Sequence, residues 1–183
     1  MSAPSPRRRP GPNLGSRPAP GRRAFAVFVC ALAPTLASAD PATFTVRQLT
    51  PETALKAAQA ALAKCRADGY QVAVAVVDRA GLTQVLLRDR FAGPHTVEIS
   101  ANKAWSAVSF RTNTSDIEKA SRPGESMSGI RQFPRMVAVG GGLMIEAGGS
   151  ILGAIGVSGA PGGAADEVCA AAGVKAIADS LEF

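Results

Sequence analysis

The chain has 183 residues, enough for one domain with an extension, and its formal net charge is +6. The excess positive charge lies in residues 1–39, which hold six arginines and no acidic residue, whereas the remainder holds 14 Lys and Arg against 14 Asp and Glu. This balance gives the folded part no global electrostatic reason to bind a polyanion, so we expect no nucleic-acid partner.

Residues 1–39 have the layout of a secretory signal. A Pro-, Arg- and Gly-rich start precedes the apolar run AFAVFVCALAPTLA, which is too short to span a bilayer, and the small residues ASA at 37–39 form a cleavage pattern. We expect export to the periplasm or medium and a mature chain, 40–183, without a membrane span. Arg22-Arg23 resembles the twin-arginine signature, and an ordinary Sec signal is the alternative.

The mature chain is predicted to begin with a helix and a hairpin. Thr50 followed by Pro51 is typical of a capped helix start, and Gly69 is typical of its end. Two β-rich runs follow at 71–78 and 82–88, and the link DRAG between them is typical of a hairpin turn.

The second half is predicted to contain helices, a loop and three more strands. A helix at 95–110 and a short one from Thr114 precede a loop at 121–135. Three short strands, beginning with MVAV at 136–139, lead to a closing helix at 164–181. No strand–helix–strand unit repeats, so the order predicts an α+β domain with a five-stranded antiparallel sheet covered by helices. The opening and closing helices should share one face of it.

The two cysteines of the mature chain, Cys65 and Cys169, fall on the first and last predicted helices. An oxidising compartment permits a disulfide if those helices pack together, and two buried free thiols are the alternative. The chain has neither a CxxC motif nor a Cys/His cluster, so we expect no zinc or iron–sulfur site.

The glycine-rich stretch 150–173 raises the question of a phosphate site. A P-loop places Lys and then Ser or Thr at the helix start, but Asp166 and Glu167 stand there and would repel a phosphate. We therefore interpret these glycines as turns and points of close approach, with a candidate pocket wall at residues 156–159.

Few side chains have the chemistry of a cofactor site. His95 is the only histidine, hence the one imidazole able to ligate haem iron, and an ordinary surface histidine is the alternative. Other candidate iron ligands are Met127, Met136, Met144, Tyr70 and the two cysteines.

The remaining candidate positions lie on the second long helix and the loop after it. Trp105 is expected in the core, and Lys103, on a different face, should point to solvent or to a pocket rim. Arg122, Arg131 and Arg135 flank the loop 121–135, where they can pair with carboxylates of a ligand. A solvated loop is the alternative.

Three segments together carry a family resemblance over residues 48–180. They are VAVVD-x-x-G at 74–81, KAWSA at 103–107 and GGGLMIEAGGSILGAIGVSGAPGGAADEVCAAAG at 140–173. The combination resembles the GlcG/HbpS family of haem-binding or haem-degrading domains, also found as the C-terminal part of PduO-type proteins. Met144 departs from the proline that the family often has at this place.

The resemblance implies a profilin-like fold, a homo-oligomer, and binding of haem or another tetrapyrrole in an iron or redox role. The expected site has His95 as the iron ligand and the following residues around the cofactor: Lys103, Arg122, Arg131, Gly141, Gly142, Ser158 and Gly159. Two alternatives remain open. One is an enzyme or accessory protein acting on a small hydroxy acid or carboxylate, and the other is a ligand-free assembly module.

Overall fold

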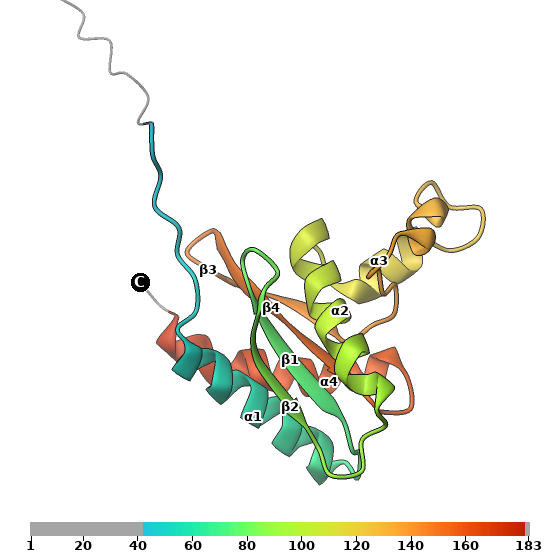
Figure 1. Cartoon of the computed structure of the whole chain (residues 1–183), viewed down its shortest axis with the longest axis horizontal. Coiled ribbons are helices and arrows are strands. Elements are labelled where there is room, and N and C mark those ends of the chain that lie inside the picture. Colours follow the sequence, from blue (N-terminus) through green and yellow to red (C-terminus); the bar gives the residue numbers. More distant parts are fainter. Residues whose placement is uncertain (1–41, 182–183) are drawn as a thin grey trace, which may run out of the picture. The chain divides into compact units, whose positions relative to one another are not determined.

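A computed structural model describes residues 42–181 of the chain (Figure 1). The expected signal at 1–39 lies outside these residues. The helices are α1 (Pro51–Ala67), α2 (His95–Phe110), α3 (Thr114–Ala120) and α4 (Gly163–Ile177), with the 3₁₀ turns η1 (Ser128–Gln132) and η2 (Ala178–Ser180). The strands are β1 (Ala73–Asp78), β2 (Thr83–Arg88), β3 (Gly142–Ala147) and β4 (Ser150–Ser158). None of the described helices is long and apolar enough to cross a membrane.

The sheet has four strands in the order β2-β1-β4-β3, and all neighbouring strands are antiparallel (Figure 1). The predicted hairpin is confirmed, but the predicted fifth strand at 136–139 is wrong. The backbone N–H of Val137 donates to Ser106 Oγ on α2 at 3.0 Å, and that of Met136 donates to the Phe133 carbonyl at 3.1 Å. This apolar segment thus bonds to a helix side chain and to the preceding turn.

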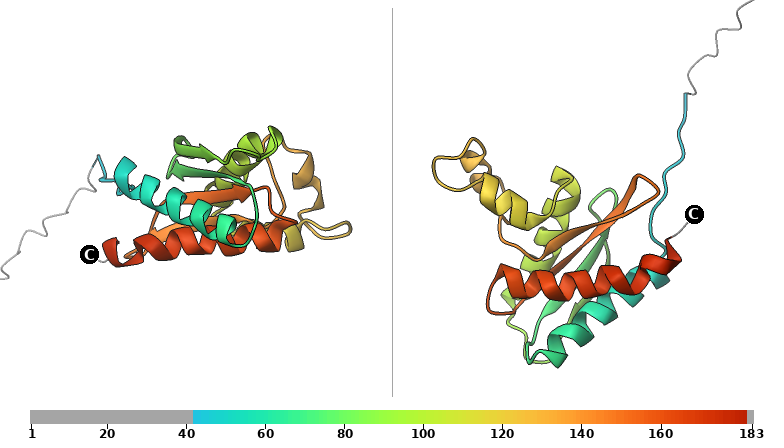
Figure 2. Two further views of the ribbon diagram at one scale, coloured as in Figure 1. Left: turned by 90° about the horizontal axis from the view of Figure 1, so that it is seen from below. Right: turned by 180° about the vertical axis from the view of Figure 1, so that it is seen from behind.

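The helices cover both faces of the sheet. Helices α1 and α4 lie side by side on one face, as expected, and α2 lies on the other (Figure 2). Side chains alternate along a strand, so the α1/α4 face is built from Val74, Val76, Ile155 and Val157, all fully buried. The α2 face has smaller residues, including Ala154.

Glycines in β3 and β4 bring α2 against the sheet with no side chain between them. A Cβ on Gly142 would lie 2.5 Å from the Lys103 carbonyl oxygen, and one on Gly156 would lie 2.6 Å from the Ala104 nitrogen. Both separations are far below van der Waals contact. The prediction that glycines in this stretch permit close approach is confirmed, and the approaching element is the backbone of α2.

The end of α1 is tied to the end of β2 by an ion pair. Arg66 donates from Nε and Nη2 to the two carboxylate oxygens of Asp89, each at 2.8 Å, and Asp89 is 1% exposed. The hydrogen bond from Arg66 is the main reason why the pKa of Asp89 falls from 3.8 to about 2. At the other end of α1, Thr50 accepts from the Thr53 N–H at 3.3 Å, which confirms the predicted cap.

A disulfide joins α1 to α4. Cys65 and Cys169 are bonded, their Cα atoms are 5.5 Å apart, and both residues are completely buried. Of the two alternatives left open by the sequence, the structure thus has the disulfide. It links positions 104 residues apart, so it restricts most of the unfolded domain.

We expect the disulfide to contribute about 2–5 kcal/mol to the free energy of unfolding, because it removes chain entropy from the unfolded state. Urea unfolding of the wild type with and without reductant should show this difference. The double variant Cys65→Ala/Cys169→Ala lacks the disulfide, so its stability should be low and should be the same with and without reductant. A wild type whose midpoint does not change after complete reduction would contradict the expectation.

We expect Asp89 to contribute to acid unfolding. Its folded pKa is lowered to about 2 from 3.8, so its stabilising effect is complete above the unfolded pKa and is lost as the pH falls towards 2. Urea unfolding between these pH values should show a flatter pH dependence for Asp89→Asn than for the wild type. Asp179→Asn, at an exposed carboxylate, is the matched control and should follow the wild type.

Candidate functional site

A buried ion pair lies where β3 begins and β4 ends. Lys103 Nζ on α2 donates to Asp166 Oδ2 on α4 at 2.6 Å, and the two side chains are only 3% and 4% exposed. The expectation that Lys103 points to solvent or to a pocket rim is therefore wrong. Helical spacing separated Lys103 from Trp105, but nothing local in the sequence identified a carboxylate 63 residues away as its partner.

Asp166 also fixes the turn that follows β4. Its Oδ1 accepts from the backbone N–H of Ala160 at 3.0 Å. Burial raises the pKa of Asp166, while the charge and hydrogen bond of Lys103 act in the opposite direction. The carboxylate is thus held by a cation on one oxygen and by the chain turn on the other.

Four predicted glycine and serine positions surround or adjoin this pair. A Cβ on Gly141, where φ is +112°, would lie 2.6 Å from Asp166 Cβ and 3.0 Å from Lys103 Nζ. Gly142 lies against the α2 backbone, and Ser158 is the buried last residue of β4. Gly159 has a φ of +130° and begins the turn that Asp166 holds. These positions and Lys103 form one cluster.

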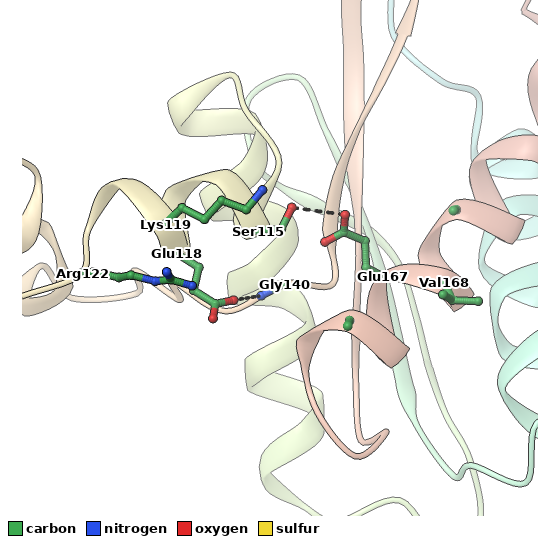
Figure 3. A pocket seen from close by; sticks show the side chains of 9 residues that line it. Ser115, Glu118, Lys119, Arg122, Gly140, Glu167 and Val168 are labelled. Carbon is green, nitrogen blue, oxygen red and sulfur yellow. Dashed lines mark hydrogen bonds between the residues drawn. The ribbon is translucent and has the colours of Figure 1, made fainter. Parts of the chain in front are cut away.

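A pocket of about 480 Å³ lies beside the cluster, between α3 and the first turns of α4 (Figure 3). One face of α3, the turn after it, one face of α4 and Gly140 line it. Ser115, Glu118 and Lys119 come from α3, Arg122 comes from the turn after it, and the residues from α4 are Ala164, Glu167, Val168 and Ala171. Of the residues predicted for the site, Arg122 alone lines this pocket.

The two carboxylates of the pocket are held by hydrogen bonds, as the dashed lines in Figure 3 show. Glu167 Oε1 accepts from Ser115 Oγ at 3.2 Å, and Glu118 Oε2 accepts from the Gly140 N–H at 3.1 Å. The second oxygen of Glu167, Oε2, is buried without a hydrogen-bond partner. Sequence analysis missed both residues, because Glu118 resembled part of a helix cap and Glu167 resembled a helix-terminal charge.

The other predicted arginine is engaged within the protein. Arg131 Nε donates to the Ser121 carbonyl at 2.7 Å, and its Nη2 donates to the Glu118 carbonyl at 3.0 Å. Arg131 therefore fastens the loop 121–135 to the end of α3. Its guanidinium is not aimed at the pocket.

The same loop also covers the outer side of α2. Trp105 stacks on Phe133 with ring centroids 6.2 Å apart, and the Arg135 guanidinium lies 4.8 Å from the Trp105 ring centroid. Trp105 is half-buried under this loop, so its expected place in the core is wrong. The tryptophan instead anchors an irregular segment to the helix.

His95 is the first residue of α2, and its side chain is exposed. The ring lies against Gly93, where an added Cβ would be 2.7 Å from the imidazole Cε1. Within residues 42–181 no hydrogen bond or ion pair occupies either ring nitrogen. The structure does not place His95 among the residues that line the pocket between α3 and α4.

The candidate iron ligands are reduced in number by the disulfide. Cys65 and Cys169 have no free thiolate, because their sulfurs are bonded to each other. The nine residues lining the pocket include no His, Cys, Met or Tyr, the usual protein ligands of haem iron. The described part of the chain also holds no cluster of three or more His, Cys, Asp or Glu suited to a metal ion.

Comparison with known proteins places the chain in a family. Residues 49–175 match the family described as haem degrading protein HbpS-like, and because this match spans more than half of the chain, the chain belongs to that family. The expected resemblance is thereby confirmed.

Three relatives illustrate the relationship. An uncharacterized 15.0 kDa protein of the dhaT–dhaS intergenic region of Citrobacter freundii is 37% identical over 116 residues, 62% of this chain and 82% of that protein. A crystal structure of a Streptomyces reticuli HbpS double mutant is 39% identical with a TM-score of 0.68, over 79% of this chain and 97% of that one. A PduOC:heme complex is 26% identical with a TM-score of 0.67, over 71% and 95%.

We expect the variant Lys103→Met to lose about 3–5 kcal/mol of stability, because Asp166 would remain buried without its partner. The double variant Lys103→Met/Asp166→Leu should lose less, since it leaves no unpaired buried charge. Chemical denaturation measures both. Lys64→Met removes one partner of the exposed Lys64–Asp68 pair and should change stability by about 0.5 kcal/mol or less. A double variant at least as unstable as Lys103→Met would contradict this account.

Proposed function

We propose that the chain is an exported haem-binding protein in which His95 is the axial iron ligand. The observation that carries the proposal is the exposed, unengaged imidazole of the only histidine in the chain. The fold supports it, because a relative with the same fold forms a complex with haem. Bound haem would supply iron redox chemistry to a protein whose own residues bind and orient it.

Comparison of the candidate iron ligands among the described residues supports His95 as the axial ligand. The sulfurs of Cys65 and Cys169 are committed to the disulfide, and Tyr70 is only partly exposed. The methionines at 127, 136 and 144 are likewise partly buried. An imidazole nitrogen is a strong neutral ligand for haem iron, and the one on His95 is accessible without rearrangement.

The segment before His95 offers the other contacts that a haem needs. Phe91 is 80% exposed and Arg90 is exposed beside it, on the turn between β2 and α2. An aromatic ring suits the apolar macrocycle, and a guanidinium suits a propionate. In this proposal the axial ligand and these contacts come from one short stretch, 90–95, at the surface of the domain.

Export and self-association are further parts of the proposal. The buried disulfide supports export, because such bonds form and persist in oxidising compartments. The sequence pattern at 1–39 supports a cleaved signal and a periplasmic or secreted location. Exposed apolar side chains such as Leu82 and Phe133 support a homo-oligomer, in which they would be covered.

We expect hemin added to the purified chain to give a shifted Soret band that saturates at one equivalent per chain, and His95→Ala to abolish that shift. Absorbance titration measures it. The matched control is Met127→Leu, which removes another candidate iron ligand and should bind like the wild type. An unshifted band in the wild type would refute haem binding, whereas an identical shift in His95→Ala would refute the ligand assignment alone.

A further inference from the structure

The pocket between α3 and α4 has a charge arrangement that haem binding at His95 leaves unused. Of its charged lining residues, the carboxylates Glu118 and Glu167 are half-buried, and the cations Lys119 and Arg122 are exposed. The four charges therefore divide the pocket into a negative inner end and a positive mouth. Its volume of about 480 Å³ is in the range typical of small-molecule sites.

One carboxylate oxygen at the inner end lacks a hydrogen-bond donor. Glu167 Oε2 is buried and has no partner, while Oε1 accepts from Ser115. A buried acceptor without a donor is unfavourable, and a charged donor is the best match for a carboxylate. Figure 3 shows this carboxylate facing the space between the two helices. Glu167 lines the pocket, so a rotation of its side chain that exposes Oε2 would let a bound ammonium group supply the missing donor.

The mouth has a cation available for an anion. Within residues 42–181 the guanidinium of Arg122 takes part in no hydrogen bond or ion pair, whereas Lys119 Nζ donates to Asp116 Oδ1 at 3.0 Å. A free guanidinium binds a carboxylate through two parallel hydrogen bonds. Arg122 is thus suited to an acid group at the mouth.

The rest of the α4 wall is apolar. Ala164, Val168 and Ala171 lie on one face of the helix, and all three are exposed, Val168 by 51%. This surface has no polar group to offer, so it suits a short aliphatic side chain. A ligand that fits all three parts carries an ammonium, a carboxylate and an aliphatic group.

We propose that the pocket between α3 and α4 binds a small aliphatic amino acid. Its ammonium group bonds to Glu167 and Glu118, its carboxylate bonds to Arg122, and its side chain lies on Val168. The site is separate from His95, which is not among the lining residues. A metal ion fits the same wall poorly, because the described residues offer no third carboxylate, His or Cys beside these two.

Isothermal titration calorimetry of the full chain with L-leucine tests the proposal. Three probes of similar carbon skeleton isolate each group: 4-methylpentanoate lacks the ammonium, isopentylamine lacks the carboxylate, and 2-hydroxy-4-methylpentanoate replaces the ammonium by a hydroxyl. L-leucine should bind saturably. The affinity of each of the other probes should be lower by about tenfold or more, because each loses one charged contact. Absence of saturable L-leucine binding, or equal affinity for the acid or the hydroxy acid, overturns the proposal.

Two variants locate the site. Glu167→Gln keeps an oxygen for the Ser115 bond but loses the charge, and Arg122→Gln removes the cation at the mouth. Each should weaken L-leucine binding by about tenfold or more. The matched controls Glu146→Gln and Arg111→Gln change exposed residues outside this pocket and should bind like the wild type. Unchanged affinity in both pocket variants overturns the assignment.

The same samples keep this proposal distinct from haem binding. Glu167→Gln should retain the Soret shift of the wild type, and His95→Ala should retain L-leucine binding. Thermal unfolding without ligand shows whether each variant is folded. A Glu167→Gln chain that is folded but loses haem and L-leucine together would contradict two separate sites.

Discussion

The ammonium of Lys103 and the carboxylate of Asp166 meet 2.6 Å apart, almost without exposure to water, and the helices that carry them lie on opposite faces of the sheet. Separating these buried charges would leave each without its partner, so the pair favours the observed position of α2 against the start of α4. Gly141 passes directly beside the pair, and the space there is too small for any side chain. The entry to β3, the exit from β4 and the wall of the α3–α4 pocket all depend on this one contact.

The position of this ion pair also brings glycines of segment 140–163 into close contact with neighbouring backbone. Gly140 and Gly163 meet backbone to backbone, since a Cβ on Gly163 would lie 2.6 Å from the Gly140 nitrogen. Gly140 in turn presents its N–H to Glu118, which fixes one carboxylate of the pocket. The glycine-rich sequence therefore shapes a cavity for other side chains and contributes little chemistry itself.

Local sequence signals predicted the elements well. The cap at Thr50, the hairpin turn before Gly81 and the shared face of the first and last helices depend on neighbouring residues or on helical spacing, and the structure confirms them. The prediction of a strand at 136–139 was wrong because an apolar run does not indicate that its backbone N–H will donate a hydrogen bond to a serine on α2. The predicted exposure of Lys103 was wrong for a similar reason, since its partner Asp166 is distant in sequence. The site residues Glu118 and Glu167 were hidden because both carboxylates also suit helix ends.

The buried disulfide has a consequence for how the chain matures. The full sequence has three cysteines, and the third, Cys30, lies within residues 1–39, which we propose are removed on export. Three thiols can form three different pairs, whereas the two that remain can form only one within the molecule. Cleavage of the leader would thus take away the sole internal competitor, and oxidation of the mature chain would need no isomerase to select the native bond between Cys65 and Cys169.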